Sequence, residues 1–363
     1  MRQIRQTTLA ILLLLTVLLT GCAGGGDMNS AGATRAVTDC VGRTVNVPEH
    51  PQRVICMYAS TAHMMAMLDE GDKIVGAADG VTRDQMMITK YPSIEDVPTP
   101  YHEGAVNVEE VMALDPDLII IKTEMYLKEA EQEKLDNTGV PYLVVDYDSI
   151  ASLKKALTVM GEAFGKSEQA QKYIAFMEQT LDTVKGRLSD VPEAQRPRVF
   201  HSVTEATKTD IVDSLCSEII STAGLIDVSA AAGVTDLGKN ATVTLEQIYA
   251  WDPDAFLCNE YAVADYIQAN PKWSGLKAVQ NKAVYTLPIG ATRWCHHGSM
   301  EPQMGALFLA KTFWPDKFTD YEWKTVIRDY YAEYFGMSLD DATIDKILSG
   351  HGMRESSPTL EME

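Results

Sequence analysis

The chain has 363 residues, a formal net charge of −20 at pH 7 and a hydrophobic fraction of 46%. A surface this acidic disfavours nucleic acid as a partner and argues against a polybasic membrane-binding patch. The length and the apolar content suffice for two lobes, each with its own core.

The first residues have the pattern of an export signal. Arg2 and Arg5 precede an apolar run, Leu9–Leu19, that is too short for an ordinary transmembrane helix. The sequence Leu-Thr-Gly-Cys at 19–22 resembles the lipobox of bacterial and archaeal lipoproteins; an ordinary signal peptide with a chance cysteine is the alternative. The lipobox implies cleavage before Cys22, lipidation of its thiol and an anchored protein on the outer face of the cytoplasmic membrane. We therefore predict these segments: signal peptide, 1–21; lipidated Cys22 and flexible tether, 22–36.

Residues 37–148 are predicted to form an N-terminal α/β lobe. Residues 38–48 have the pattern of a hairpin with Gly42 at its turn. The next elements expected are a strand, Arg53–Met57, a helix, His63–Asp69, and a strand, Lys73–Ala77.

Two segments repeat one pattern 137 positions apart: NVEEVMALDPDLIII at 107–121 and TLEQIYAWDPDAFL at 244–257. Each begins with an N-cap residue, Asn107 or Thr244, and has Glu110 or Gln247 three positions later, which is the pattern of a capping box. The helix must stop near the proline, because the residue before a proline avoids the α region. The apolar run that follows suits a strand buried on both faces. The repeat predicts two similar α/β halves.

A helical block lies between the two halves. One helix is expected from Ser149 to Phe164, ended by Gly165, and a second from an N-cap at Ser167 to about Leu188. Two further helices are expected near the C-terminus, at Tyr321–Phe335 and Leu339–Leu348, with Ser338 and Asp341 as a capping pair and Gly336 and Gly350 as stops. The remaining predicted segments are the connector, 149–190; the C-terminal α/β lobe, 191–320; the helical extension, 321–350; and the tail, 351–363.

Four stretches together carry a resemblance to a known family. They are the run TDCVGRTVNVPEHPQRVICMYASTAHMMAMLDEGDKIVGAAD at 38–79, the two repeats, and NPKWSGLKAVQNKAVYTLP at 270–288. They resemble the class III substrate-binding proteins of ABC importers for iron-siderophore complexes, haem and cobalamin. The resemblance covers roughly residues 37–315.

The resemblance implies an α/β fold of two Rossmann-like lobes joined by one long rigid helix, with the helical extension appended. It implies a monomeric carrier, not an enzyme, with no cofactor of its own. The carrier would hold its ligand between the lobes and deliver it to a permease dimer with its ATPase. Glu109 and Glu246, in the first turns of the two repeated helices, match glutamates that pair with permease arginines in the family.

The candidate ligand residues lie on loops, since parallel strands present ligands at their carboxyl ends. They are Tyr58, Ser60, Arg83, Tyr101, His102, Glu205, Arg293, Trp294, His296 and His297. An aromatic residue at the position of Trp294 contacts the ligand in the family. Arginine and aromatic side chains suit anionic or ring-containing ligands.

The expected ligand is an iron complex, either a ferric siderophore or haem, with a slight preference for the siderophore; cobalamin is the alternative within the family. No direct metal site is expected, although Tyr101, His102, His296 or His297 could be an axial ligand of haem iron. Five cysteines remain besides Cys22, without CxxC or metal-type Cys/His spacing, and no disulfide framework is predicted. Cys56 and Cys258 are expected to be small buried hydrophobic residues.

The sequence disfavours two other function classes, an enzyme and a receptor for a free metal ion. The chain has no GxSxG, HExxH, P-loop or Rossmann glycine motif, which disfavours an enzyme. A receptor for a free metal ion would show widely spaced His and Asp ligands and long His-rich loops, which this sequence lacks.

Overall fold

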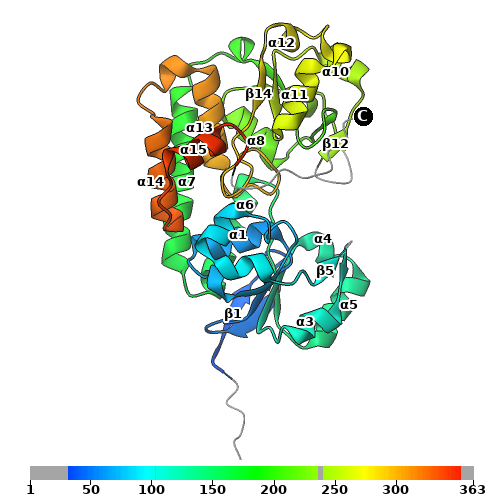
Figure 1. Cartoon of the computed structure of the whole chain (residues 1–363), viewed down its shortest axis with the longest axis vertical. Coiled ribbons are helices and arrows are strands. Elements are labelled where there is room, and N and C mark those ends of the chain that lie inside the picture. The colour runs from blue at the N-terminus through cyan, green and yellow to red at the C-terminus, as the bar shows by residue number, and fades with distance from the viewer. Residues whose placement is uncertain (1–31, 103, 236–239, 353–363) are drawn as a thin grey trace, which may run out of the picture. The chain divides into compact units, whose positions relative to one another are not determined.

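Two four-stranded parallel sheets with the same strand order form the framework of the protein (Figure 1). The computed structural model describes residues 32–102, 104–235 and 240–352. The first sheet has the order β4-β3-β7-β8 and the second the order β11-β9-β13-β14, so each places its first strand between its second and its third. The strands are β3 (Val54–Cys56), β4 (Ile74–Ala77), β7 (Leu118–Ile121), β8 (Tyr142–Val144), β9 (Arg198–Ser202), β11 (Ile226–Asp227), β13 (Ala255–Cys258) and β14 (Val284–Thr286). The two predicted α/β lobes are confirmed.

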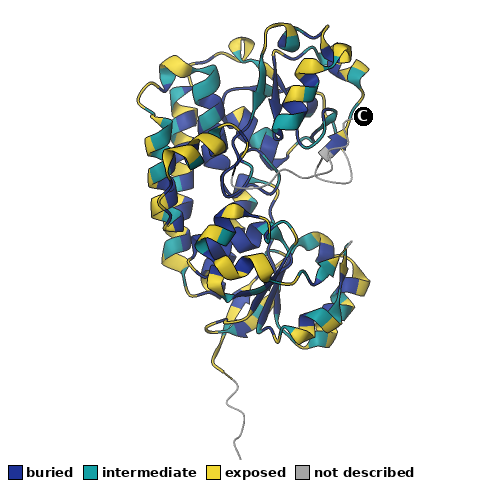
Figure 2. Ribbon diagram, viewed as in Figure 1, coloured by how far each residue is buried: buried dark blue, intermediate teal, exposed yellow. Residues whose placement is uncertain are grey.

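Each sheet is buried on both faces, as the apolar runs predicted. All four residues of β7 are buried, and alternate residues join different cores: Leu118 and Ile120 one, Ile119 and Ile121 another. Helices cover both faces, which is why the strands lack polar alternation (Figure 2). The helices of the lobes are α1 (Ala59–Met67), α2 (Gln85–Lys90), α3 (Val108–Ala113), α4 (Thr123–Tyr126), α5 (Glu129–Thr138), α8 (Leu215–Thr222), α9 (Val228–Ala231), α10 (Leu245–Trp251), α11 (Tyr261–Ala269), α12 (Lys277–Gln280) and α13 (Pro302–Phe313).

Short elements complete the lobes. Two small antiparallel pairs are β5 (Tyr101–His102) with β6 (Ala105–Val106), and β10 (Lys208–Asp210) with β12 (Asn240–Thr242). The 3-10 turns are η1 (Gly71–Lys73), η2 (Pro92–Asp96), η3 (Glu193–Gln195), η4 (Pro271–Trp273) and η5 (Pro315–Lys317).

The predicted N-terminal hairpin is present, but it starts earlier than expected. β1 (Thr34–Thr38) pairs with β2 (Thr44–Pro48), and Gly42 at the turn has φ +88°, a conformation that favours glycine. Thr34 pairs with Pro48, so the last three residues of the predicted tether belong to a strand. The predicted signal peptide and Cys22 lie outside the described residues.

The connector consists of two packed helices, α6 (Ile150–Ala163) and α7 (Ser167–Arg187). Ser149 caps α6 through a capping box with Ser152, and Gly165, at φ +67°, separates the two helices. The prediction of Ser167 as the N-cap of α7 was wrong by one residue, since Lys166 holds that position without a side-chain cap. At 1.5 Å per residue, α7 is about 30 Å long.

One continuous apolar core runs through both lobes along this connector. It includes Val54 and Leu118 of the first sheet, Tyr173 and Met177 of α7, and Leu257 of the second sheet. Interiors of this kind are close-packed and resist deformation. The core therefore supports the expectation of a stiff protein with small lobe closure.

The C-terminal extension comprises α14 (Trp323–Phe335) and α15 (Asp341–Leu348). Gly336 ends α14 in the left-handed region, as predicted, but the N-cap of α15 is Asp340, which replaces the expected pair of Ser338 and Asp341. The side chain of Asp340 accepts a hydrogen bond from the Thr343 amide at 2.8 Å. α14 contacts α1 of the first lobe and also packs beside α7, so the extension is not confined to the second lobe.

Candidate functional site

Three segments that follow strands of the two sheets meet at one carbonyl group, that of Gly298. The Ser60 hydroxyl, in the first turn of α1 after β3, donates to this oxygen at 2.9 Å. The Tyr147 hydroxyl, after β8, donates to it at 2.8 Å. Gly298 itself lies 12 residues after β14, on the segment that leads to α13. This contact joins loops of the two lobes at the edge where parallel strands present ligands.

The surroundings of Gly298 bring four of the predicted ligand residues together. A Cβ atom on Gly298 would lie 3.2 Å from both the Tyr58 hydroxyl and the Ser60 hydroxyl, and 3.5 Å from His296 Nδ1. His296 Nδ1 accepts from the Gly298 amide at 3.1 Å, and the His296 and His297 ring centroids are 3.8 Å apart. We refer to Tyr58, Ser60, Tyr147, His296, His297 and Gly298 as the Gly298 cluster.

Tyr147 and Gly298 were missed in the sequence. Tyr147 is 2% exposed, its ring lies 6.4 Å from that of Tyr58, and burial raises its pKa well above the usual tyrosine range. The sequence does contain a signal for Tyr147, since it follows the apolar run 142–145, which forms a buried strand and the residue after it. Gly298 carries no such signal, because its role rests on contacts with residues more than 150 positions away.

A buried acid holds the segment between β14 and α13 in place. Glu301 is fully buried; one of its carboxylate oxygens accepts from the Thr292 amide at 2.6 Å and from the Thr292 hydroxyl at 2.9 Å. The other oxygen accepts from the Tyr331 hydroxyl of α14 at 2.9 Å. Burial raises the pKa of Glu301, against the lowering effect of these donors. α14 thus supports the segment that carries His296 and Gly298.

Trp294 lies in the interior rather than at the candidate ligand surface. It is 0% exposed, and its indole packs near Phe308 and Trp323, with centroids 6.2 and 6.0 Å away. Gly305 approaches the Trp294 carbonyl so closely that a Cβ atom there would lie 2.4 Å from the oxygen. In this structure Trp294 acts as a core residue that anchors the loop, and it offers no surface to a ligand.

The two candidate arginines are already paired with carboxylates. Arg293 Nε donates to Glu260 Oε1 at 2.7 Å, and a guanidinium nitrogen contacts the same oxygen; the two side chains are 17% and 3% exposed. Arg83 donates to Asp79 at 2.6 Å on the surface, where both side chains are exposed. A ligand that recruits either arginine must compete with a neighbouring acid.

The remaining candidates lie on loops with local partners. His102, on the β5–β6 hairpin with Tyr101, is exposed, and its Nε2 lies 3.2 Å from Glu110 Oε2 on α3. Glu205 lies 3.7 Å from Lys208 Nζ in the turn between β9 and β10. The described contacts of these three residues do not connect them to the Gly298 cluster.

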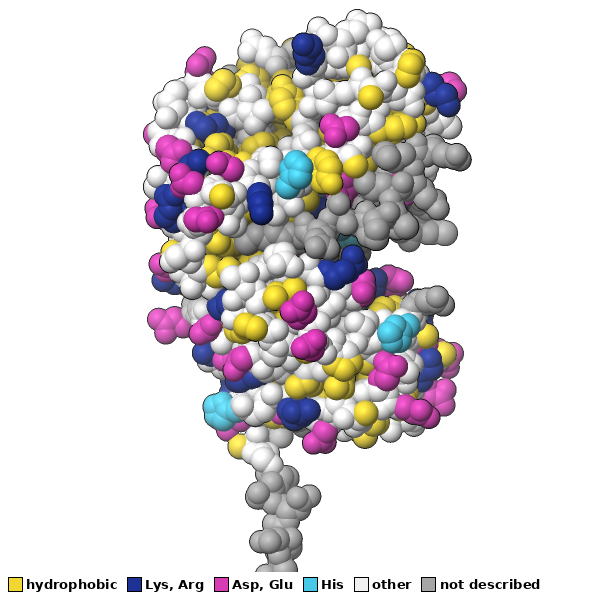
Figure 3. Space-filling view, in the orientation of Figure 1, with side chains coloured by type: hydrophobic (Ala, Val, Ile, Leu, Met, Phe, Trp, Pro, Cys, Tyr) yellow, Lys and Arg dark blue, Asp and Glu magenta, His cyan; other side chains and the backbone are white. Residues whose placement is uncertain are grey.

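Glu109 and Glu246 occupy matching positions on the two lobes. Both are exposed and both are the second residue of their helix, after the N-caps Asn107 and Thr244. Each N-cap side chain accepts from the amide three residues later, at 3.3 and 3.2 Å. The capping therefore leaves both glutamate side chains at the surface. Figure 3 shows further acidic side chains over both lobes, with Lys and Arg among them.

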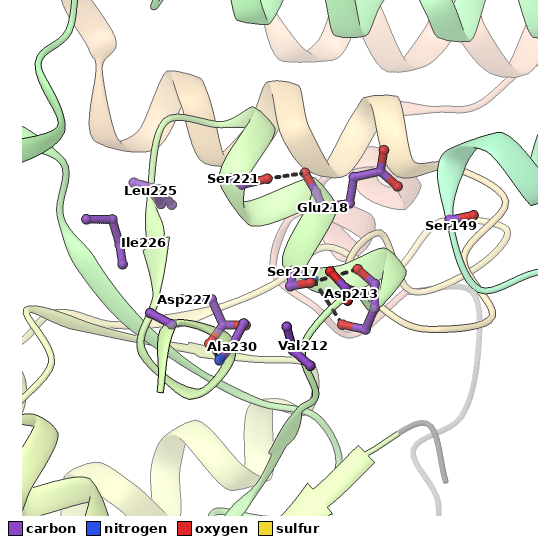
Figure 4. A pocket seen from close by; sticks show the side chains of 12 residues that line it. Ser149, Val212, Asp213, Ser217, Glu218, Ser221, Leu225, Ile226, Asp227 and Ala230 are labelled. Atoms are coloured by element: carbon purple, nitrogen blue, oxygen red, sulfur yellow. Dashed lines mark hydrogen bonds between the residues drawn. The ribbon is translucent and has the colours of Figure 1, made fainter. Parts of the chain in front are cut away.

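A surface cavity of about 560 Å³ lies beside α8 and β11 (Figure 4), and its described lining includes none of the predicted ligand residues. It is bordered by α8, β11 and Ser149, and several of its lining residues are serines or acids, among them Ser217, Glu218 and Asp213. Glu218 accepts from the Ile150 amide at 2.8 Å, which ties α8 to the start of α6. Among the described residues, the lining includes no cation and no aromatic side chain, which are the groups that an anionic or ring-containing ligand would need.

Comparison with known proteins settles the family. The model of the family described as periplasmic binding protein matches residues 54–289, which is more than half of the chain. The chain belongs to the periplasmic binding protein family. As a member of this family it is a binding protein, and the fold expected from the sequence is that of its relatives.

The names of individual relatives of this periplasmic binding protein give different ligands. The molybdate-binding protein MolA of Haemophilus influenzae is 23% identical over 348 residues, 89% of this chain and 97% of that protein. The ferric enterobactin-binding protein FepB of Escherichia coli is 25% identical over 319 residues, 82% and 97% of the two chains. The lipoprotein YvrC of Bacillus subtilis, named an uncharacterised ABC transporter substrate-binding lipoprotein, is 25% identical over 325 residues, 86% and 98% of the two chains.

Solved structures agree on the fold. A periplasmic solute-binding protein of Veillonella parvula superposes with a TM-score of 0.76 at 23% identity, covering 88% of this chain and 99% of that one. MolA with bound molybdate gives a TM-score of 0.75 at 21% identity, covering 84% and 99%. Within the part of the binding protein that the structure describes, every helix is too short or too polar to cross a membrane.

Proposed function

We propose that the chain is the substrate-binding protein of an ABC importer and carries a metal-containing small molecule, a ferric siderophore or haem, between its lobes. The observation that carries this proposal is the meeting of Tyr58 of the first lobe with His296 at Gly298. A ligand seated there would touch both lobes at once, which couples its binding to their relative position.

The chemistry of the Gly298 cluster suits such a ligand. Phenol and imidazole groups bind iron and also donate hydrogen bonds to anionic oxygens. Tyr101 and His102 lie on another loop, so His296 and His297 are the better candidates for axial ligands of haem iron. In the sequence, Trp294 and the two arginines favour a siderophore over haem. In the structure Trp294 is buried and both arginines have acidic partners, so these residues no longer favour either ligand.

A small oxyanion is the second candidate. Tyrosine hydroxyls and an imidazole N–H are donors that an oxyanion such as molybdate accepts. The relative MolA, named for molybdate, aligns with 89% of this chain. Molybdate therefore belongs in any test of the ligand.

Delivery is proposed to use Glu109 and Glu246 as contacts for arginines of a permease dimer that works with an ATPase. One exposed carboxylate on each lobe fits a partner with two matching cationic sites. The carrier is proposed to act as a monomer that is not an enzyme.

The proposed location is the outer face of the cytoplasmic membrane, with Cys22 as the lipid attachment site. The relative YvrC is named as a lipoprotein. Cys22→Ala is expected to leave the chain unprocessed or to release it from the membrane, because stable anchoring needs the acyl chains. Normal processing with full membrane retention in this variant would contradict the anchor.

The ligand proposal is tested by calorimetric titration of the purified chain with a ferric catecholate, a ferric hydroxamate, haem, cobalamin and molybdate. We expect one of the iron complexes to bind, and we expect Tyr58→Phe and His296→Ala each to weaken it at least tenfold, a loss of about 1.4 kcal/mol. His50→Ala, an exposed histidine before β3, is the matched control and should not change affinity. Binding of molybdate alone would favour the second candidate. If Tyr58→Phe and His296→Ala both bind the iron complex with unchanged affinity, the proposed site is refuted.

A further inference from the structure

Three metal-binding side chains meet inside the second lobe, apart from the Gly298 cluster. His201, Cys216 and Cys295 each offer a ligand atom, and these atoms lie within 4.8 Å of one another. All three residues are at most 1% exposed. They are far apart in the sequence, which is why no metal-type spacing could be recognised there.

Three separate elements bring these side chains together. His201 belongs to β9, an inner strand of the second sheet, and Cys216 to the first turn of α8, whose N-cap Ser214 accepts from the Ser217 amide. Cys295 follows Trp294 on the segment between β14 and α13. Trp294 is buried in the core and Gly305 lies against its carbonyl group, so the backbone that carries Cys295 is held in place.

The orientation of His201 points to a ligand at its second nitrogen. Nδ1 lies 2.6 Å from Asp210 Oδ2, and both side chains are fully buried. A carboxylate accepts here, so Nδ1 carries the proton and Nε2 is left to bind. Among the described residues Nε2 has no hydrogen-bond partner. A histidine held by a carboxylate while its other nitrogen faces two cysteines is the usual arrangement around a protein-bound metal.

We propose that His201 Nε2, Cys216 Sγ and Cys295 Sγ bind a thiophilic divalent metal ion of the Zn²⁺ class. Two thiolates and one neutral imidazole are a ligand set that zinc accepts, with a fourth position left for another donor. Binding releases two thiol protons to solvent, and the divalent charge then balances the two thiolates. A monovalent copper ion would leave a negative charge in the interior, and Mg²⁺ or Ca²⁺ would require oxygen ligands.

The metal would link the segment between β14 and α13 to the second sheet. Cys295 lies next to His296 of the Gly298 cluster, whereas His201 and Cys216 belong to β9 and α8. Coordination would join these elements beneath the loop that carries His296 and His297. A disulfide between Cys216 and Cys295 is the competing outcome, and it would leave the orientation of His201 by Asp210 without a role.

The test uses the full chain, reduced with a phosphine and then loaded with Zn²⁺ or Co²⁺. We expect one metal equivalent per chain, and thiolate-to-cobalt charge-transfer absorption for the Co²⁺ form. Cys216→Ser, Cys295→Ser and His201→Gln should each lower Zn²⁺ affinity at least tenfold. Asp210→Asn should lower it by about 10–100-fold and keep the thiolate-to-cobalt absorption, as expected for a residue that positions His201. Cys258→Ser, an equally buried cysteine on β13, is the matched control and should bind normally.

A second readout needs no variant and so does not depend on folding of mutants. Zn²⁺ should protect Cys216 and Cys295 from alkylation under partly denaturing conditions, but not Cys258, as read by peptide mass spectrometry. Less than a tenth of an equivalent of metal on the reduced chain would overturn the proposal. Equal alkylation with and without Zn²⁺, or a Cys216–Cys295 disulfide in protein taken from the extracytoplasmic face of its host, would also overturn it.

Discussion

Asp117 and Asp254 make the same contact in the two lobes. Asp117 accepts from the Gln52 and Arg53 amides at 2.7 and 3.0 Å, and Asp254 accepts from the Arg198 amide at 2.7 Å. Each aspartate also donates its own amide to the carbonyl of the same arginine. The repeated Asp-Pro-Asp sequence thus locks the start of one strand to the start of its neighbour.

Removing these two carboxylates should lower the free energy of unfolding by different amounts. Asp117→Ala loses two hydrogen bonds from backbone amides, whereas Asp254→Ala loses one and also its exposed ion pair with Lys277 at 2.9 Å. A hydrogen bond contributes about 0.5–1.5 kcal/mol and an exposed ion pair less, so the first variant should be the less stable. Urea denaturation of both, beside Asp182→Ala on the exposed face of α7, measures the difference. Equal stability of all three variants would show that the shared contact contributes little.

The two arginines should respond very differently to truncation. Arg293→Ala leaves Glu260, which is 3% exposed, without its charged partner, and we expect a loss of about 3 kcal/mol in the free energy of unfolding. Arg83→Ala removes a surface pair and should change stability by less than about 0.5 kcal/mol. Thermal and urea unfolding of both variants checks this. Restoration of stability in Arg293→Ala by a second change, Glu260→Gln, would support the assigned cause, and no restoration would contradict it.

Glu301 should make stability depend on pH. Its folded-state pKa is raised by burial, so its contribution to stability is full below the unfolded-state pKa and is lost as the pH rises through the folded-state value. The stability of the wild type relative to Glu301→Gln should therefore fall as the pH rises above the ordinary glutamate pKa of about 4.3. Urea unfolding at several pH values measures this relative slope; a slope of the opposite sign would mean that the Thr292 and Tyr331 donors outweigh burial.

The docking glutamates should matter for uptake and not for ligand binding. In Glu109→Ala with Glu246→Ala we expect uptake to be abolished, while affinity and melting temperature change little, because a first-turn acid contributes only about 0.3–1 kcal/mol to its helix. Glu133→Ala with Glu162→Ala, two exposed helical glutamates elsewhere, is the control. Uptake at the control rate in the docking variant would remove the role of both residues.

Local features of the fold could be predicted from the sequence. Asn107 and Thr244 act as N-caps, and the two helices end at Ala113 and Trp251, before their Asp-Pro-Asp sequences. These features depend on a few neighbouring residues. The repeat predicts the matched lobes and the helical pattern after Ser167 predicts the long α7, and the structure contains both.

Features that depend on distant contacts could not be predicted. Trp294 was placed at the ligand because its loop is rich in polar and aromatic residues, but its packing near Phe308 and Trp323 buries it. The contact of Ser60 with Gly298, and the meeting of His201 with Cys216 and Cys295, join residues that no local pattern relates. The sequence therefore identifies the loop that carries Trp294 and His296 as a candidate, but it does not show which of its side chains face outward.

The most direct test of the carrier proposal is to purify the chain from its native host and record its absorption spectrum and the mass of the released ligand. We predict one iron complex per chain, with the charge-transfer bands of a ferric siderophore or the Soret band of haem, the latter shifted in His296→Ala or His297→Ala. Recovery of molybdate or cobalamin as the bound molecule, with no iron complex, would contradict the proposal.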